Sequence, residues 1–248
     1  MRRRRAFRWH LSLGVLLVVA SVPRPATAQT ASPGTVLVEL DRGDVRVVPS
    51  PGAELRVRAW ALGQGPDAGA DDPGLVTVAE SGDVVRISAR SAHVGGVGLE
   101  IGLPAGAILE VRLHRGDITA SELVATLDLE TARGDVHLRD VGGSALVDVE
   151  NGNITASFRS LDPARPNAFS TLNGNLDLTV PRDASFDLQV RCRGCTLPDM
   201  NLPGELQRNR ILAPAPGDPI LMLEGKVNGG GPGLRVFTWN GEVRIAGR

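Results

Sequence analysis

Four aspartates in repeated glycine turns are the first candidates for chemistry in this sequence. They are Asp44, Asp83, Asp117 and Asp135. The interval between Asp117 and Asp135 recurs between Asp135 and Asn153, so a chain that coils once per interval would bring the two carboxylates together. Paired carboxylates can hold a calcium ion or act on a glycosidic bond. Asn153 and Asn175 take the same place without a charge, however, and Asp or Asn beside glycine is typical of turns, so turn chemistry is the favoured interpretation.

Histidines and serines offer little further chemistry. Beyond residue 28 the histidines are His93, His114 and His137, and none has a ligand-like spacing to another histidine or cysteine. Alternation with the apolar residues beside them predicts that His114 and His137 point to solvent. No serine stands in a Gly-x-Ser-x-Gly sequence. The sequence therefore predicts no catalytic residue, no metal site, no cofactor and no enzyme activity.

Cys192 and Cys195 are the only two cysteines of the chain and form a candidate disulfide. A bridge that closes so short a loop would contribute only about 2 kcal/mol to stability. Redox-active pairs of this spacing usually begin a helix, and the following residues 196–199 are a poor helix start. A local disulfide or inert thiols are favoured, with redox chemistry and metal binding as the alternatives.

Residues 1–28 have the pattern of a cleaved secretory signal peptide. An arginine-rich start precedes an apolar run at 11–20, and Ala26 and Ala28 flank a cleavage point before Gln29. A membrane anchor is the alternative, but a bilayer requires roughly 20 apolar residues, which is about twice the length of this run. Arg4 and Arg5 leave export by the twin-arginine route open. We expect an extracytoplasmic protein, periplasmic, cell-surface or secreted, with no membrane span after signal cleavage.

Charge and composition restrict the partners. Six arginines lie in the first 28 residues, which hold no acidic residue, so 21 basic and 28 acidic residues leave the rest of the chain at a net charge of −7. Such a chain repels phosphate, and no nucleic-acid partner is expected. The absence of tyrosine and the small number of other aromatic residues argue against a broad aromatic platform for sugars.

A short sequence motif repeats along the chain. In this motif, glycine and a small polar or acidic residue precede alternating apolar positions. Its glycines are Gly43, Gly82, Gly116, Gly134, Gly152, Gly174 and Gly241. The central spacings are 18, 18 and 22 residues. Glycine admits positive φ and its polar neighbour bonds backbone nearby, which is the chemistry of a turn. The structural turn residues that we predict are Gly116, Asp117, Gly134, Asp135, Gly152, Asn153, Gly174, Asn175 and Gly241.

The segments between these turns alternate as strands do. Leu109, Val111 and Leu113 recur one glycine period later as Leu127, Leu129 and Thr131, and two periods later as Ala145, Val147 and Val149. Matched apolar positions indicate that equivalent residues stack. We predict an all-β fold, a β-solenoid or β-helix-like roll of short repeated strands with glycine–acid turns. Residues 162–167 are expected to form an outward loop, and residues 205–212 a short helix or an irregular connection.

Three segments carry a resemblance to a known family. They are residues 101–111 (IGLPAGAILEV), 178–188 (LTVPRDASFDL) and 234–245 (LRVFTWNGEVRI). Together with the glycine turns, they resemble the bacterial β-strand-repeat “putative adhesin” family, a domain of unknown function in secreted and envelope proteins. The likeness covers residues 36–248 and departs at residues 193–196, where the family tends to have another glycine–acid turn. It implies a solenoid-like fold outside the cytoplasm and transfers no catalytic residue.

The domain organisation predicted is a signal peptide at 1–28, a linker at 29–35 and one β-repeat domain at 36–248. We expect a non-catalytic secreted or envelope-associated protein that makes adhesion-like contact with a protein or cell-surface polymer. Two alternatives remain: a carbohydrate-active enzyme on a β-solenoid, and a regulatory sensor of envelope stress. Clustered carboxylates on one outer face, with perturbed pKa values, would favour the enzyme.

Overall fold

The protein is all-β in the part that the structure, a computed structural model, describes: residues 34–64, 72–89, 95–193, 202–211 and 220–248. The predicted signal peptide lies outside the described residues, as do most of the linker, His93 and Cys195. In the described part, the single helical element is a short 3-10 helix, η2, at Pro73–Leu75. All-β architecture is therefore confirmed.

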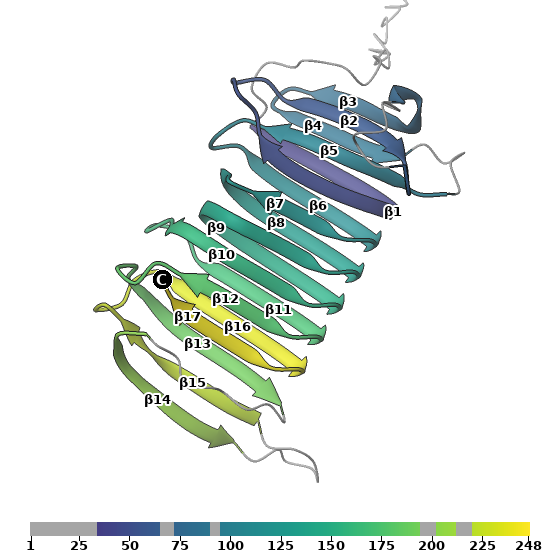
Figure 1. Cartoon of the computed structure of the whole chain (residues 1–248). Coiled ribbons are helices and arrows are strands. Elements are labelled where there is room, and N and C mark those ends of the chain that lie inside the picture. The colour runs from purple at the N-terminus through teal and green to yellow at the C-terminus, as the bar shows by residue number, and fades with distance from the viewer. Residues whose placement is uncertain (1–33, 65–71, 90–94, 194–201, 212–219) are drawn as a thin grey trace, which may run out of the picture.

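Seventeen strands form one continuous hydrogen-bonded sheet that coils along the stack (Figure 1). They are β1 (Thr35–Pro49), β2 (Arg56–Ala61), β3 (Val76–Ser81), β4 (Val84–Ala89), β5 (Val97–Leu103), β6 (Ile108–Arg115), β7 (Ile118–Ser121), β8 (Val124–Arg133), β9 (Val136–Asn151), β10 (Ile154–Leu161), β11 (Asn167–Asn173), β12 (Leu176–Val180), β13 (Phe186–Arg193), β14 (Gly204–Ile211), β15 (Ile220–Val227), β16 (Gly233–Asn240) and β17 (Val243–Gly247).

Two parallel ladders make up the body of the sheet. The first ladder has the order β4, β1, β6, β8, β9, β11, β16, β13, and the second has the order β5, β1, β7, β9, β10, β12, β17. The long strands β1 and β9 contribute one half to each ladder. A repeated glycine carries the chain from the first ladder to the second at six places: Gly43, Gly116, Gly134, Gly152, Gly174 and Gly241.

The register between coils is the one that the glycine period predicts. Leu109 pairs with Leu127 and Leu127 with Ala145, while Val111 pairs with Leu129 and Leu129 with Val147. All these residues except Val147 are 0% exposed. Because side chains alternate across a strand, this register sends one apolar column after another into the interior between the ladders.

The core of the second ladder shows how columns build the interior. Ile118, Val136, Ile154, Leu176 and Val243 occupy equivalent positions on five successive strands, each at most 1% exposed. Branched aliphatic side chains pack well on a pleated surface and bury their methyl groups against the coil above and below. No single coil could bury its apolar residues alone, so the stack folds as a unit.

At both ends the order of coils departs from the order of the chain. Strand β1 lies between the later strands β4 and β6 on one side and between β5 and β7 on the other. Strand β16 lies between β11 and the earlier strand β13. Antiparallel pairs β3–β4, β13–β15 and β14–β15 cover both ends of the first ladder, and β2–β5 covers one end of the second. The glycine spacing therefore loosens toward the ends because the coils there are completed by distant segments.

Arg248 ties the inserted final strand to the middle of the molecule. Its guanidinium forms an ion pair with Asp140 and donates to the backbone oxygen of Phe158 at 3.3 Å. The hydrogen bond from Arg248 lowers the pKa of the Asp140 carboxyl. Asp140 lies at a kink of β9 and has a φ of 52°.

The expectation for residues 205–212 is wrong. Residues 204–211 form strand β14, which pairs antiparallel with β15 along its whole length. The sequence here lacks clear apolar alternation, and its conformation is set by the partner strand that satisfies its backbone hydrogen-bonding groups. Residues 162–166, by contrast, lie between β10 and β11 and form a loop, as predicted.

Replacing Val136 with Asp tests the stacked core. Val136 is 0% exposed between Ile118 and Ile154, so a carboxylate there loses its hydration without gaining a partner. We expect the free energy of unfolding to fall by about 3 kcal/mol or more in urea denaturation. Val124→Asp is the matched control, because Val124 is 49% exposed on β8 and should tolerate the charge. An equal denaturation midpoint for the two variants would refute the register.

Candidate functional site

The corner between the two ladders is built on a column of glycines. Six of the seven repeated glycines take part: Gly43, Gly116, Gly134, Gly152, Gly174 and Gly241. Gly134 has a φ of +145°, and a Cβ on it would lie 1.9 Å from the backbone oxygen of Gly116. The other five have a similar backbone oxygen at 1.7 to 1.9 Å from such a Cβ. Only glycine permits this approach, and Gly82, which turns the β3–β4 hairpin, is outside the column.

The polar residue after each glycine bonds the next coil. Asp135 donates its backbone N–H to Asp117 Oδ1 at 2.8 Å, and Asn153 donates its own to Asp135 Oδ1 at 2.7 Å. The same bond joins Asp117 to Asp44, Asn175 to Asn153, and Glu242 to Asn175. The sequence interpretation expected bonds within each turn; the bonds run between coils because the stacking places each backbone N–H under the preceding side chain. The structure thus brings Asp117 and Asp135 together as parts of a turn ladder.

Two further columns support the corner, and sequence reasoning missed both. Asn173 donates its amide to Asn151 Oδ1 at 2.8 Å, and Asn240 donates to Asn173 Oδ1 at 2.7 Å. Each of these asparagines directly precedes a repeated glycine, which is the pattern that could have revealed them. Buried Thr171 and Thr238 donate their hydroxyls to the glycine oxygens of the corner. Fully hydrogen-bonded columns of this kind define a rigid structural element.

Cys192 lies at the buried end of β13, is 0% exposed and is disulfide-bonded. The candidate partner Cys195 falls outside the described residues.

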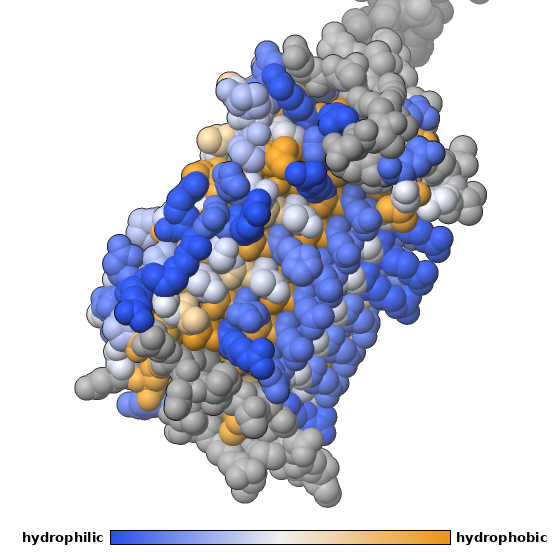
Figure 2. Space-filling view, viewed as in Figure 1, coloured by the Kyte–Doolittle hydropathy of each residue, from blue (hydrophilic) through white to orange (hydrophobic). Residues whose placement is uncertain are grey.

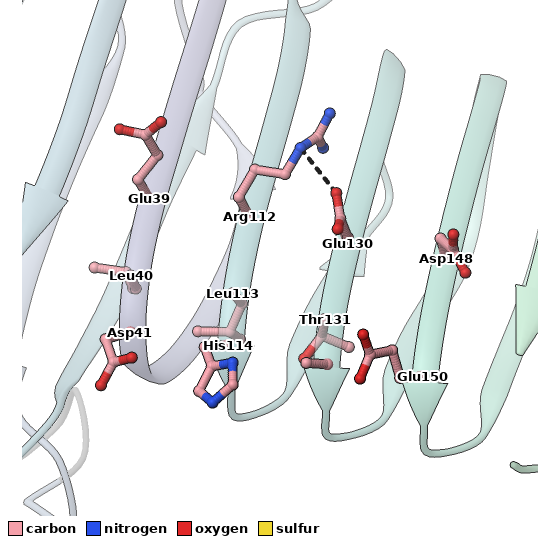
Figure 3. A pocket seen from close by; sticks show the side chains of 11 residues that line it. Glu39, Leu40, Asp41, Arg112, Leu113, His114, Glu130, Thr131, Asp148 and Glu150 are labelled. Atoms are coloured by element: carbon pink, nitrogen blue, oxygen red, sulfur yellow. Dashed lines mark ion pairs between the residues drawn. The ribbon is translucent and has the colours of Figure 1, made fainter. Parts of the chain in front are cut away.

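The outer face of the first ladder carries an acidic groove that no sequence motif predicted. The groove has a volume of about 600 Å³. Its ionisable lining residues, from β1, β6, β8 and β9, are Glu39, Asp41, Arg112, His114, Glu130, Asp148 and Glu150 (Figure 3). Glu39, Arg112, Glu130 and Asp148 stack in one column because they occupy equivalent outward positions. Arg112, Glu130 and Asp148 follow one another at the glycine period, so the repeat could have revealed this part of the column.

Arg112 organises the carboxylates around it. Its guanidinium contacts Asp128 Oδ1 at 3.1 Å and Glu130 Oε2 at 3.0 Å. The hydrogen bond with Asp128 raises the pKa of Arg112, so this residue stays cationic. Glu39 pairs with Arg86 of β4 at 2.7 Å, but Asp41, Asp148 and Glu150 leave the groove with an excess of negative charge.

An aromatic–basic patch lies on the same outer face, farther along the ladder. We define it by Leu172 of β11, Arg235, Phe237 and Trp239 of β16, and Arg191 and Arg193 of β13. Leu172 is 47% exposed, the rings of Phe237 and Trp239 are 6.4 Å apart, and Arg193 Cζ lies 4.7 Å from the Trp239 ring centre. Such a contact between a guanidinium and an aromatic face is attractive. Two of the few aromatic residues are thus adjacent, although they are too few to form a broad platform.

The outer face of the second ladder is more mixed in character. A smaller groove of about 280 Å³ is lined by Asp135, His137, Thr155, Asp177 and Arg244, among others. His114 and His137 are both exposed, as alternation predicts. Rows of hydrophilic residues follow the stack along one side of the molecule, beside neutral and hydrophobic areas (Figure 2).

No group of three or more His, Cys, Asp or Glu residues in the described part of the chain is arranged to hold a metal ion. No helix in the described ranges is long and apolar enough to cross a bilayer.

Comparison with known proteins finds likeness only among solved structures. No family model matches the chain, and no curated protein matches it. A structure described as a “putative cell adhesion protein” from Clostridium sporogenes ATCC 15579 is 9% identical, covers 89% of this chain and 97% of its own, and has a TM-score of 0.43. A “putative adhesin” from Bacteroides fragilis NCTC 9343 is 8% identical, with 89% and 94% covered and a TM-score of 0.33. Both descriptions name adhesion proteins, as does the name of the family that three segments of the sequence resemble.

Replacing Gly134 with Ala tests the corner column. The added methyl would meet the Gly116 oxygen at 1.9 Å, so adjacent coils must separate. We expect the free energy of unfolding to fall by about 3 kcal/mol or more, measured by urea denaturation followed with circular dichroism. Gly52→Ala is the control, since nothing lies within 4 Å of a Cβ at that position. Should both variants unfold at the same midpoint, close backbone approach would not be the constraint at the corner.

Proposed function

We propose that this protein is a non-catalytic, secreted or envelope-associated β-solenoid that contacts a protein or surface polymer through the outer face of its first ladder. The observation that carries the proposal is the placement of an acidic groove and an aromatic–basic patch on successive strands of that one face. The glycine corner and the stacked core hold the face in shape.

A face of this construction is suited to binding. Parallel strands present equivalent side chains about 4.8 Å apart, so a partner meets groups already in position. Preorganised groups lose less conformational entropy on association. Tryptophan and arginine, which stack here as Trp239 and Arg193, are the residue types that most often dominate binding energy at protein interfaces.

The location outside the cytoplasm is proposed from residues 1–28 and from cysteine chemistry. The leader has the three regions of a signal peptide. Cys192 is disulfide-bonded, and disulfides form and persist mainly in oxidising compartments. A contact protein placed there would meet envelope proteins and surface polymers.

Site-specific photo-crosslinking in intact cells tests this function. A photoreactive residue in place of Trp239 should capture a partner, because Trp239 lies within the aromatic–basic patch. The same residue in place of Thr155, on the outer face of the second ladder, is the control and should capture markedly less. Cell fractionation of the captured product checks the compartment. Equal capture at both positions, or a product confined to the cytoplasm, would contradict the proposal.

A carbohydrate-active enzyme is the second candidate, and the clustered carboxylates Glu130, Asp148 and Glu150 are the observation that favours it. Under the proposal made above, purified protein releases no reducing ends from envelope polysaccharides. Release that disappears with Glu130→Gln and persists with Glu80→Gln, a change in the distant β3–β4 hairpin, would establish the enzyme instead.

A further inference from the structure

We infer that the partner of the first-ladder face is a second copy of this chain, bound face to face with its stack axis reversed. This inference rests on the proposed function in one respect, namely that this face is a contact surface. The argument comes from the order in which charge and apolar groups follow one another along the ladder.

The first-ladder face is acidic at one end and basic at the other. Outward acidic residues gather on four successive strands: Glu39 and Asp41 of β1, Glu110 of β6, Asp128 and Glu130 of β8, and Asp148 and Glu150 of β9. Outward arginines gather beyond them at Arg235 of β16 and at Arg191 and Arg193 of β13, where Asp187 is the outward acidic residue. Within the acidic region Arg112 and His114 are basic, and Arg86 of β4 pairs with Glu39 at its edge.

Where the two regions meet, exposed apolar side chains lie among the charged ones on β9, β11 and β16. Leu146 of β9 is 41% exposed and Leu172 of β11 is 47% exposed. They are followed by the adjacent rings of Phe237 and Trp239 on β16. Exposed leucines beside aromatic rings on a sheet face favour burial against a partner. The order along the ladder is therefore acidic, then partly apolar, then basic.

A two-fold axis parallel to the strands and passing near β11 reverses this order in the second copy. Strand β11 then faces its own equivalent, β16 faces β9, and β13 faces β8. Leu172 meets Leu172 of the other copy, and Arg191 faces Glu130, since both occupy the same outward column. An interface on a two-fold axis must be self-complementary in this way. A copy stacked in the same direction would set acidic groups against acidic groups.

The size of the face suits a reversible dimer. The axis near β11 pairs five strands of the ladder with counterparts: β8, β9, β11, β16 and β13. At about 4.8 Å spacing, with about six residues of about 3.3 Å each, they give a flat area of roughly 500 Å² on each copy. The total of roughly 1,000 Å² lies in the range of weak, transient interfaces. We therefore expect monomer and dimer in exchange, with an affinity that falls as salt screens the charge pairs.

Sedimentation velocity on protein purified from cells that express the full chain tests the inference. The wild type should dimerise as concentration rises, and Arg191→Glu should raise the dimer Kd by about tenfold or more because a carboxylate then opposes Glu130. Glu130→Arg alone should weaken the dimer as well. The double variant Arg191→Glu/Glu130→Arg should recover most of the affinity, a result that a non-specific loss of stability would not produce.

Asp177→Arg, on the outer face of the second ladder, is the matched control and should leave the dimer Kd unchanged. A protein that stays monomeric at every concentration would overturn the inference, as would a dimer indifferent to the exchange at positions 130 and 191. Monomeric protein whose Trp239 position still captures a different molecule in cells would overturn the second copy as partner and leave the proposed function standing. A dimer found in a cytoplasmic fraction would overturn the proposed function and leave the second copy as partner standing.

Discussion

Close backbone approach at the glycine corner is the constraint on which the rest of the structure depends. At Gly134 a single methyl group would collide with the oxygen of Gly116, and the same holds at each step of the column. Because the glycine backbones of adjacent coils are in contact, the strands on either side lie within hydrogen-bonding distance. The aliphatic side chains of adjacent coils then pack against one another. The Asp and Asn side chains then satisfy the backbone N–H groups that the turns would leave without a partner.

The interleaved ends address a weakness of stacked coils. An open end would expose apolar side chains and a free strand edge, which can pair with other chains. Here β1 and β16 are enclosed by strands from elsewhere in the sequence, and antiparallel strands lie beyond β4, β5 and β13. The contacts that close the ends join segments far apart in the chain. Such pairings carry a high entropic cost of loop closure and favour slow folding.

The same register that builds the core also orders the surface. An outward residue in one coil lies beside its counterparts in the next, so a difference between coils appears as a change of chemistry along the stack. Glu130 and Asp148 follow Arg112 in one column, while Phe237 and Arg191 continue that column farther on. The acidic groove and the aromatic–basic patch are therefore two parts of one polarised face, and the proposed partner follows from that polarity.

The sequence by itself determined the all-β class, the turn glycines and the register of the central coils. These features depend on local chemistry: Gly134 and Asp135 favour a turn, alternation at Leu127 and Leu129 defines an inward face, and a constant glycine spacing aligns neighbours. The tertiary structure alone decided that β16 lies beside β11, that residues 204–211 form a strand, and that Arg193 stacks on Trp239. Each of these features depends on which distant segment pairs with an open strand edge. Almost any sequence can form backbone hydrogen bonds at such an edge, so the choice of partner strand leaves no local sequence pattern.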